Sequence, residues 1–339
     1  MTEERKLSYK QAVIEAIGQE MDRDETVFMM GQTVTEWDDH FNPGISGLVH
    51  KFGVTRIRPT ALVEHLEAGA GVGAALAGMR PIVDLFSAAF GSVAYDEIFA
   101  KAGLWTYEHG GNGGMSVPIV FRMPYTSYGT SGAEHCRSPL AQYMHGIGLA
   151  IAVPTTPADA KGLMTAAIRA DFPVAFFEPG PLAQVVGPVP AGEYILPFGS
   201  ARIAREGSDC TVVAVGYQVA LALEAAAELE RDGIEIEVID PRTLVPLDIE
   251  AITRSVLKTG HLVEVDEDFA RCGIGAEVAF QVQERVFGAL QAPVVRVAPR
   301  YPSPSSPVLN REVMPTAEKI ADAVRNVINY RPQALLVES

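Results

Sequence analysis

The sequence predicts an α/β protein with two parallel-sheet domains, and three observations support this prediction. Short runs rich in β-branched residues alternate with longer segments of helical periodicity, as expected when helices connect parallel strands. A length of 339 residues suits about two domains of ordinary size. Residues 178–206 contain five prolines and several glycines, the composition of a connection between domains.

In the first half of the chain, the first helix is predicted from a capping box at Ser8 and Gln11, followed by apolar residues at four-residue spacing. An apolar run at 26–30 predicts a buried strand that ends at Gly31. Residues 66–79 are rich in Ala and Gly, which suits a helix packed closely against other backbone. The other predicted elements are strands at 81–86, 117–121, 149–153 and 174–177, and a helix at 157–170 capped by Thr156.

The same alternation resumes after the proline-rich segment. Each apolar run of four to six residues is followed by a longer helical pattern, as in the first half. The predicted strands are 210–215, 234–239, 261–265 and 294–297, and the predicted helices are 218–232, 248–258, 276–286 and 316–328. We therefore expect a first domain at 1–185, a linker at 186–206, a second domain at 207–330 and a tail at 331–339.

Composition and charge narrow the classes of function. The chain has 42 acidic against 27 basic residues, a net charge of −15, which argues against binding of nucleic acid or of an anionic membrane surface. Its three cysteines are widely spaced and match neither a disulfide framework nor a zinc site. The N-terminus is charged and lacks the apolar stretch of a signal peptide, so we expect a cytoplasmic protein.

Two residues are candidates for chemistry on local grounds. His135 follows a loop of small residues, and such loops often lie beside ligands. Glu64 precedes the Ala/Gly-rich helix, where an ordinary acid interacting with the helix dipole is the simpler explanation. Gly273-Ile274-Gly275 lacks the third glycine of a dinucleotide fingerprint, so a tight turn between strand and helix is the better interpretation.

Several ordered segments resemble one family over roughly residues 8–328. The central one begins Leu62-Val63-Glu64 and continues into the glycine-rich run that ends at Pro81. The supporting segments are 132–135, 153–163, 238–248 and 273–277. Together they are similar to the beta subunits of 2-oxoacid dehydrogenases of the pyruvate, branched-chain and acetoin types, which depend on thiamine diphosphate.

This resemblance implies a pyrimidine-binding domain followed by a transketolase C-terminal-type domain. It assigns Glu64 to the carboxyl that hydrogen-bonds the aminopyrimidine ring of the cofactor, and places Leu62 with it among the cofactor-binding residues. Phe90 matches the aromatic residue that packs on the aminopyrimidine. His135 matches a histidine near the entrance for substrate and lipoyl group, where it would orient the substrate or exchange protons during acyl transfer.

The chain contains no Gly-Asp-Gly segment, the motif with which thiamine enzymes hold the metal of the diphosphate. The resemblance therefore implies an alpha subunit that supplies the Mg²⁺ site, in a heterotetramer of two alpha and two beta subunits. A dihydrolipoyl acyltransferase core would then accept the acyl group on its lipoamide. A structural potassium ion is left open, because Ala170 and Phe172 stand where Asp and Asn are expected, although Asp171 is adjacent.

Other departures from the family pattern concern the entrance. Gln32 and Thr33 replace the acidic residues that follow the first strand. Tyr125 and Tyr128 lie in the loop before the histidine, where they would either narrow the substrate entrance or pack on the alpha subunit.

Two alternative functions remain at this point. A split transketolase would share the domain pair and the glutamate, but it would need basic residues for a sugar phosphate. Only Arg122 and Arg137 flank the loop. A purely structural or regulatory subunit would have no need of Glu64, Phe90 and His135 together.

Overall fold

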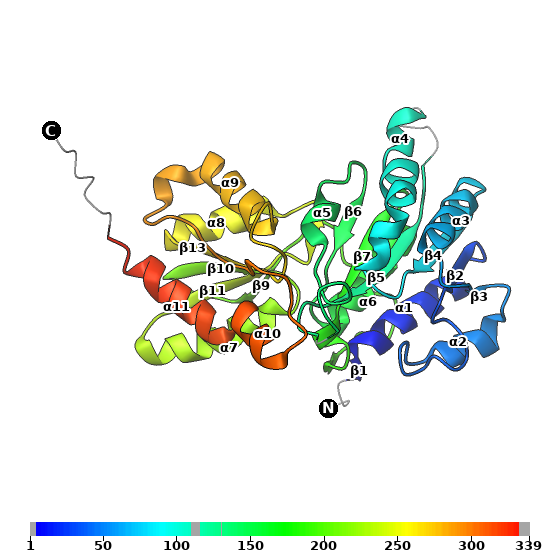
Figure 1. The fold of residues 1–339 in the computed structure, drawn as a ribbon, viewed down its shortest axis with the longest axis horizontal. Coiled ribbons are helices and arrows are strands. Elements are labelled where there is room, and N and C mark those ends of the chain that lie inside the picture. Colours follow the sequence, from blue (N-terminus) through cyan, green and yellow to red (C-terminus); the bar gives the residue numbers. More distant parts are fainter. Residues whose placement is uncertain (1–4, 110–115, 130, 332–339) are drawn as a thin grey trace.

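The computed structural model describes residues 5–109, 116–129 and 131–331. It contains two lobes that lie side by side, each with a central sheet and helices on its faces (Figure 1). The α/β class is therefore confirmed. A separate two-stranded antiparallel sheet joins β1 (Lys6–Ser8) to β8 (Val186–Pro188), so the start of the chain is tied to the connection between the lobes.

The first lobe contains a seven-stranded sheet with the order β12-β6-β7-β5-β4-β2-β3. All its strands run parallel except β12, which comes from the second half of the chain and pairs antiparallel with β6. The sheet is mostly parallel, as predicted, and the antiparallel strand β12 covers the otherwise open side of β6. The strands are β2 (Val27–Gly31), β3 (Ile57–Pro59), β4 (Arg80–Asp84), β5 (Val120–Tyr125), β6 (Ala150–Ala152), β7 (Val174–Pro179) and β12 (Thr243–Val245).

The second lobe contains a five-stranded sheet with the order β14-β13-β10-β11-β9. Its strands are parallel except for β9, which is antiparallel to β11 at one edge. The strands are β9 (Arg202–Arg205), β10 (Cys210–Ala214), β11 (Ile236–Asp240), β13 (Leu262–Val265) and β14 (Val295–Val297).

Helices cover both sheets, and several begin where the sequence predicted. Ser8 and Gln11 form the capping box of α1, and the Thr156 hydroxyl caps α6. The α-helices are α1 (Tyr9–Arg23), α2 (Ile45–Phe52), α3 (Glu64–Leu76), α4 (Trp105–Glu108), α5 (Leu140–Met144), α6 (Pro157–Arg169), α7 (Gln218–Leu229), α8 (Ile249–Thr259), α9 (Ile274–Val286), α10 (Pro307–Val313) and α11 (Ala317–Ile328). The 3₁₀ turn η1 (Phe90–Ala94) and the π-helix η2 (Asp96–Gly103) follow β4.

Close packing of α3 on the sheet depends on glycine. A Cβ at Gly71 would lie 2.5 Å from Val83 Cγ2 of β4 and 2.9 Å from Ile119 Cδ1. Any larger residue at this position would push the helix away from the strand, and the helix start would move with it. The small residues of α3 thus fix the distance between its first turn and the strand ends.

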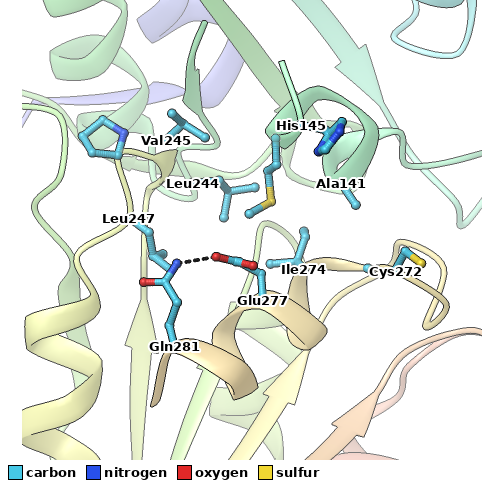
Figure 2. A pocket seen from close by; sticks show the side chains of 12 residues that line it. Ala141, His145, Leu244, Val245, Leu247, Cys272, Ile274, Glu277 and Gln281 are labelled. Atoms are coloured by element: carbon cyan, nitrogen blue, oxygen red, sulfur yellow. Dashed lines mark hydrogen bonds between the residues drawn. The ribbon is translucent and has the colours of Figure 1, made fainter. Parts of the chain in front are cut away.

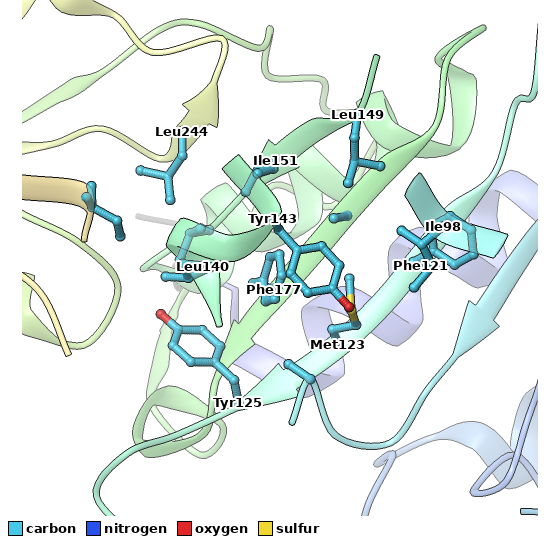
Figure 3. Packing of buried hydrophobic residues seen from close by; sticks show 14 of the residues in the cluster. Ile98, Phe121, Met123, Tyr125, Leu140, Tyr143, Leu149, Ile151, Phe177 and Leu244 are labelled. Atoms are coloured by element: carbon cyan, nitrogen blue, oxygen red, sulfur yellow. The ribbon is translucent and has the colours of Figure 1, made fainter. Parts of the chain in front are cut away.

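The two lobes share apolar packing. One buried cluster runs from the face of the first sheet through Leu244 and into α8 and α9 of the second lobe. Figure 3 shows part of this cluster, in which the Tyr143 and Phe177 rings meet edge to face with centroids 5.1 Å apart. Because the core is continuous, the lobes form one packed body in this structure. Within the described residues, no helix is long and apolar enough to span a membrane.

Candidate active site

Four loops of the first lobe meet at one edge of its sheet. Gln32 follows β2, Thr60 follows β3, Phe90 lies just beyond β4, and the His135 loop follows β5. These strands are parallel neighbours, so their carboxyl ends lie along the same edge. This is the edge at which open α/β sheets bind ligands.

Glu64 is the first residue of α3 and is 6% exposed. The helix has no capping side chain at Val63, so its first-turn N–H groups and dipole favour an acidic group at this position. The Gln32 side-chain amide donates to Glu64 Oε1 at 3.4 Å. The carboxyl predicted to be catalytic therefore lies in a largely water-free position, fixed by the start of the helix.

A second carboxyl lies one helical turn beyond Glu64, and sequence reasoning missed it. Glu67 is completely buried, accepts a hydrogen bond from the Thr60 hydroxyl, and lies 3.5 Å from the Gln32 amide nitrogen. Burial raises the pKa of Glu67, and the nearby Glu64 carboxylate adds to the increase. The three-residue spacing from Glu64 could have revealed it, because residues i and i+3 share a helix face.

Phe90 and His135 come from different loops and are in contact. Their rings meet edge to face, with centroids 5.0 Å apart and an interplanar angle of 83°. The Arg137 guanidinium donates to Ala89 O at 2.7 Å and to Ser92 Oγ at 3.2 Å, which fastens the His135 loop to the turn that carries Phe90. The His135 ring remains exposed, as a group that meets a substrate should be.

Of the predicted site residues, some are in direct contact in the structure and others are not. The rings of Phe90 and His135 are in contact. Helix α3, which begins at Glu64, packs against η1, the turn that begins at Phe90. No direct contact joins Glu64 to either ring among the hydrogen bonds and aromatic pairs of the described chain. Leu62 is 73% exposed and lies at the surface just before α3.

The His135 loop is anchored on the second lobe. Ser127 donates its backbone N–H to a carboxylate oxygen of Glu267 and its hydroxyl to Glu267 O at 3.1 Å. Ser127 O accepts hydrogen bonds from Ser303 Oγ at 2.7 Å and from the Asn310 amide at 2.8 Å. All four groups are buried, so the loop depends on the second lobe for its position.

Glu267 belongs to an acidic group that follows β13. Burial raises the pKa of Asp266 and Glu267 to about 7 and that of Asp268 to about 6. The carboxylate of Asp268 accepts the backbone N–H of Ala141 at 2.7 Å, a second link between the lobes. One oxygen of Glu267 and one of Asp266 have no hydrogen-bond partner.

The two tyrosines expected at the entrance lie elsewhere. Tyr125 is 3% exposed and packs edge to face on Phe177, as part of the core (Figure 3). Tyr128 donates its hydroxyl to Pro315 O at 3.1 Å and packs on Tyr217 of the second lobe. The interpretation that Tyr125 narrows the entrance was wrong, because β5 extends to Tyr125 and carries its ring into the core.

Arg122 is not free to bind a substrate phosphate. It is fully buried and binds Glu178 through two nitrogens, Asp84 Oδ2 at 2.7 Å and Asn42 Oδ1 at 2.5 Å. Asp84 also accepts the backbone N–H of Phe86, whose φ of +60° is unusual for a bulky residue. This ion network therefore holds the turn between β4 and Phe90.

The Gly273 turn has a packing role. α9 begins at Ile274, and a Cβ at Gly275 would lie 2.0 Å from a Glu264 carboxylate oxygen. A cavity of about 510 Å³ lies between α5, the residues after β12 and the start of α9. Figure 2 shows Glu277 and Gln281 hydrogen-bonded on its wall, with His145 opposite. None of the predicted site residues lines this cavity.

Comparison with known proteins gives a consistent result across both lobes. Residues 5–184 match the transketolase pyrimidine binding domain and residues 199–320 the transketolase C-terminal domain. A solved split-gene transketolase, an inactive beta4 tetramer, superimposes with a TM-score of 0.78 over 96% of this chain and 99% of its own, at 21% identity. That identity supports the fold alone.

Curated relatives are more similar in sequence. The pyruvate dehydrogenase E1 component subunit beta of Rhizobium meliloti is 39% identical over 96% of this chain and 71% of its own. The acetoin:2,6-dichlorophenolindophenol oxidoreductase subunit beta of Cupriavidus necator is 40% identical, over 96% and 98%. The 2-oxoisovalerate dehydrogenase subunit beta of Bacillus subtilis is also 40% identical, over 96% and 99%.

Proposed function

Because this chain belongs to the family of thiamine-dependent 2-oxoacid dehydrogenase E1 beta subunits, we propose that it forms the pyrimidine side of a shared thiamine diphosphate site. The enzyme would oxidatively decarboxylate a 2-oxoacid and pass the acyl group to lipoamide. The proposal rests on one observation. A buried carboxyl at the first turn of α3 lies at the ligand-binding edge of the sheet, on the helix that packs against the Phe90 turn.

The residues present fit the aminopyrimidine end of the cofactor. Glu64 offers a shielded carboxyl that, among the described residues, is hydrogen-bonded by one side chain, Gln32. This leaves the carboxyl free to bond a ring nitrogen. The half-buried Phe90 ring offers an apolar surface for a flat heterocycle. Thiamine diphosphate, when bound, supplies the electron-accepting ring that makes loss of carbon dioxide from a 2-oxoacid feasible.

Each side chain then has a role that follows from its surroundings. Glu64 would hold a proton at its carboxyl and hydrogen-bond the pyrimidine nitrogen, as general acid–base groups do. Phe90 would exclude water from that hydrogen bond. His135, exposed and oriented by the Phe90 edge and the Arg137 tether, would orient the substrate or exchange a proton at its imidazole. Leu62 would contact the cofactor or the alpha subunit from the surface.

The diphosphate end would be held by an alpha subunit. The chain contains no Gly-Asp-Gly segment, and the described residues contain no group of three His, Cys, Asp or Glu side chains arranged for a metal ion. We therefore assign Mg²⁺ to the alpha subunit, in an assembly of two alpha and two beta subunits. A dihydrolipoyl acyltransferase core would be the next partner.

A potassium ion does not fit the segment to which the family resemblance assigned it. Asp171 is the only carboxylate between Ala167 and Pro173, and its side chain is bound by the Arg80 guanidinium. A cation there would compete with a charge already in place. We propose no potassium site at this segment.

The split-transketolase alternative lacks its phosphate-binding residues. Arg122 is enclosed by Asp84 and Glu178, and Arg137 is used to fasten the loop to Ala89 and Ser92. Arg122 is therefore not free to receive a sugar phosphate, and Arg137 has one guanidinium nitrogen committed to the loop. A transfer of ketol units between sugars is therefore not favoured by this geometry.

The test is to co-express the chain with an alpha subunit and measure decarboxylation of a panel of 2-oxoacids, with thiamine diphosphate and Mg²⁺ present. We expect Glu64→Gln to lower turnover by roughly 10²–10⁴-fold, the range for loss of a positioned proton donor. The exposed Glu284→Gln is the matched control and should retain activity. Assembly is checked by size-exclusion chromatography.

The outcomes separate the alternatives. A Glu64→Gln complex with full activity would overturn the proton role of Glu64. Ketol transfer between sugars without release of carbon dioxide would establish the transketolase alternative. Tight binding of thiamine diphosphate by the chain without an alpha subunit would contradict the assignment of the metal site to the partner.

A further inference from the structure

Glu67 has no role in the function proposed above, yet it is completely buried beside Glu64. Both carboxyls lie in the first turn of α3, on the same face of the helix. A buried acid without a structural salt bridge is costly, because burial opposes its ionised form. Among the ion pairs of the described residues, none includes Glu67. Its position next to the candidate catalytic carboxyl therefore points to a role at that carboxyl.

One amide lies between the two acids. Gln32 Nε2 is 3.4 Å from Glu64 Oε1 and 3.5 Å from Glu67 Oε2, and the Thr60 hydroxyl bonds the other oxygen of Glu67. Gln32 and Thr60 follow β2 and β3, which are paired in the sheet (Figure 1). The two strand ends therefore hold the side chain of Glu67 in place and connect it to Glu64 through a shared donor.

We propose that Glu67 is a positioning residue that sets the proton affinity of Glu64 through the shared Gln32 amide and through direct electrostatic repulsion. This inference rests on the proposed role of Glu64. When Glu67 is neutral, the Gln32 amide is available to Glu64. When Glu67 is ionised, it competes for that amide and opposes the ionisation of Glu64.

The charges around Glu67 support this role. Glu64 on the same helix and Asp84 at the end of β4 both raise the pKa of Glu67, after burial itself. Asp84 is already bound by Arg122, which limits its influence. Glu97 of η2 approaches α3 near Gly69, two residues further along the helix. Among the described residues no cation is paired with Glu67. Burial is the largest cause of its raised pKa, and the hydrogen bonds from Thr60 and Gln32 oppose that increase.

The experiment compares pH profiles of the complex with its alpha subunit. Glu67→Gln keeps the size and a hydrogen-bonding group but cannot ionise, so Glu64 would lose its proton more readily. We expect the alkaline limb of the kcat/KM profile to move toward lower pH by about one unit. Glu97→Gln is the matched control on the neighbouring element and should leave the profile unmoved. A structural role alone would lower the rate without moving the limb.

A second variant and a second measurement keep the test decisive. Gln32→Met removes the shared donor at similar size, and it should also move the limb if the amide couples the acids. Infrared difference spectra between the original complex and Glu67→Gln, recorded without thiamine diphosphate, should contain a protonated-carboxyl band above pH 5 that belongs to Glu67. The buried carboxyls of Asp266, Glu267 and Asp268 contribute equally to both samples and cancel. If neither the band nor the limb depends on Glu67, this inference is wrong. If Glu64→Gln is fully active, the proposed function itself fails.

Discussion

The two residues proposed for chemistry are positioned in different ways. Glu64 depends on elements of the first lobe alone: the start of α3, the close fit of Gly71 on β4, and Gln32 after β2. His135 lies on a loop whose anchor, Ser127, is held by Glu267, Ser303 and Asn310 of the second lobe.

This difference suggests that each part of the site is positioned by a different part of the molecule. The proton-handling side of the site is built into one sheet edge, where short connections leave little freedom. The substrate-facing side is set by how the lobes pack together. Changes at the contact between the lobes should therefore affect His135 and leave Glu64 almost untouched, while the rings of Phe90 and His135 provide the direct contact between the two sides.

The largest effect that would test this division is expected from Glu267→Leu. The substitution leaves the buried N–H of Ser127 without its acceptor, and an orphaned buried donor costs about 2–3 kcal/mol. We expect a corresponding fall in unfolding free energy in urea, and a fall of roughly tenfold in turnover as the loop loses its position. Binding of thiamine diphosphate to the complex should stay near its original strength, because Glu64 is unchanged.

The conservative Glu267→Gln serves as the control for this prediction. Its amide oxygen can still accept the Ser127 N–H, so both turnover and stability should be largely restored. If Glu267→Leu weakens cofactor binding as much as turnover, the two sides of the site are not positioned independently.

A somewhat smaller effect is expected from pH, acting on the second lobe. Burial raises the pKa of Asp266 and Glu267 to about 7 and that of Asp268 to about 6, whereas unfolded carboxyls titrate near pH 4, about the ordinary value. The folded state thus binds protons more tightly. The stability from these groups is fully present below the unfolded pKa and is lost as pH rises through about 6 to 7.

Urea unfolding at pH 5.5 and pH 8 measures this dependence. We expect these groups to lower the unfolding free energy by on the order of 1 kcal/mol over that interval. The dependence should flatten in Asp266→Asn/Glu267→Gln. Equal slopes in the original and the double variant would show that these carboxyls do not titrate in this range.

Sequence patterns were most informative where local rules dominate. The capping box of α1, the Thr156 cap of α6 and the alternating order of strands and helices are all present, because each depends on a few neighbouring residues. The antiparallel edge strand β12 was missed, since pairing with β6 joins residues about ninety positions apart. β3, α2 and the turns after Phe90 were also missed, being short or irregular.

In the candidate site, too, contacts between distant parts of the chain were not predicted from the sequence. The family resemblance pointed to Glu64, Phe90 and His135, and the contact of the two rings agrees with a common location, although their roles remain predictions. Tyr125 was misplaced because the end of β5 could not be located from composition. The hydrogen bond from the Asn310 amide to Ser127 O joins residues 183 positions apart, and no local sequence pattern predicts such a contact.

The smallest effect concerns the contact between the two sides of the site. An edge-to-face pair contributes about 0.5–1.5 kcal/mol beyond its buried area, and the exposure of His135 places this pair near the lower end. A double-mutant cycle with Phe90→Leu and His135→Gln, read out as kcat/KM for the best 2-oxoacid, should give a coupling of about 0.5 kcal/mol. A coupling of zero would mean that the Arg137 tether, not the ring contact, orients the imidazole. A coupling several times larger would mean that the two sides of the site act as one unit, and the division between the lobes would then be wrong.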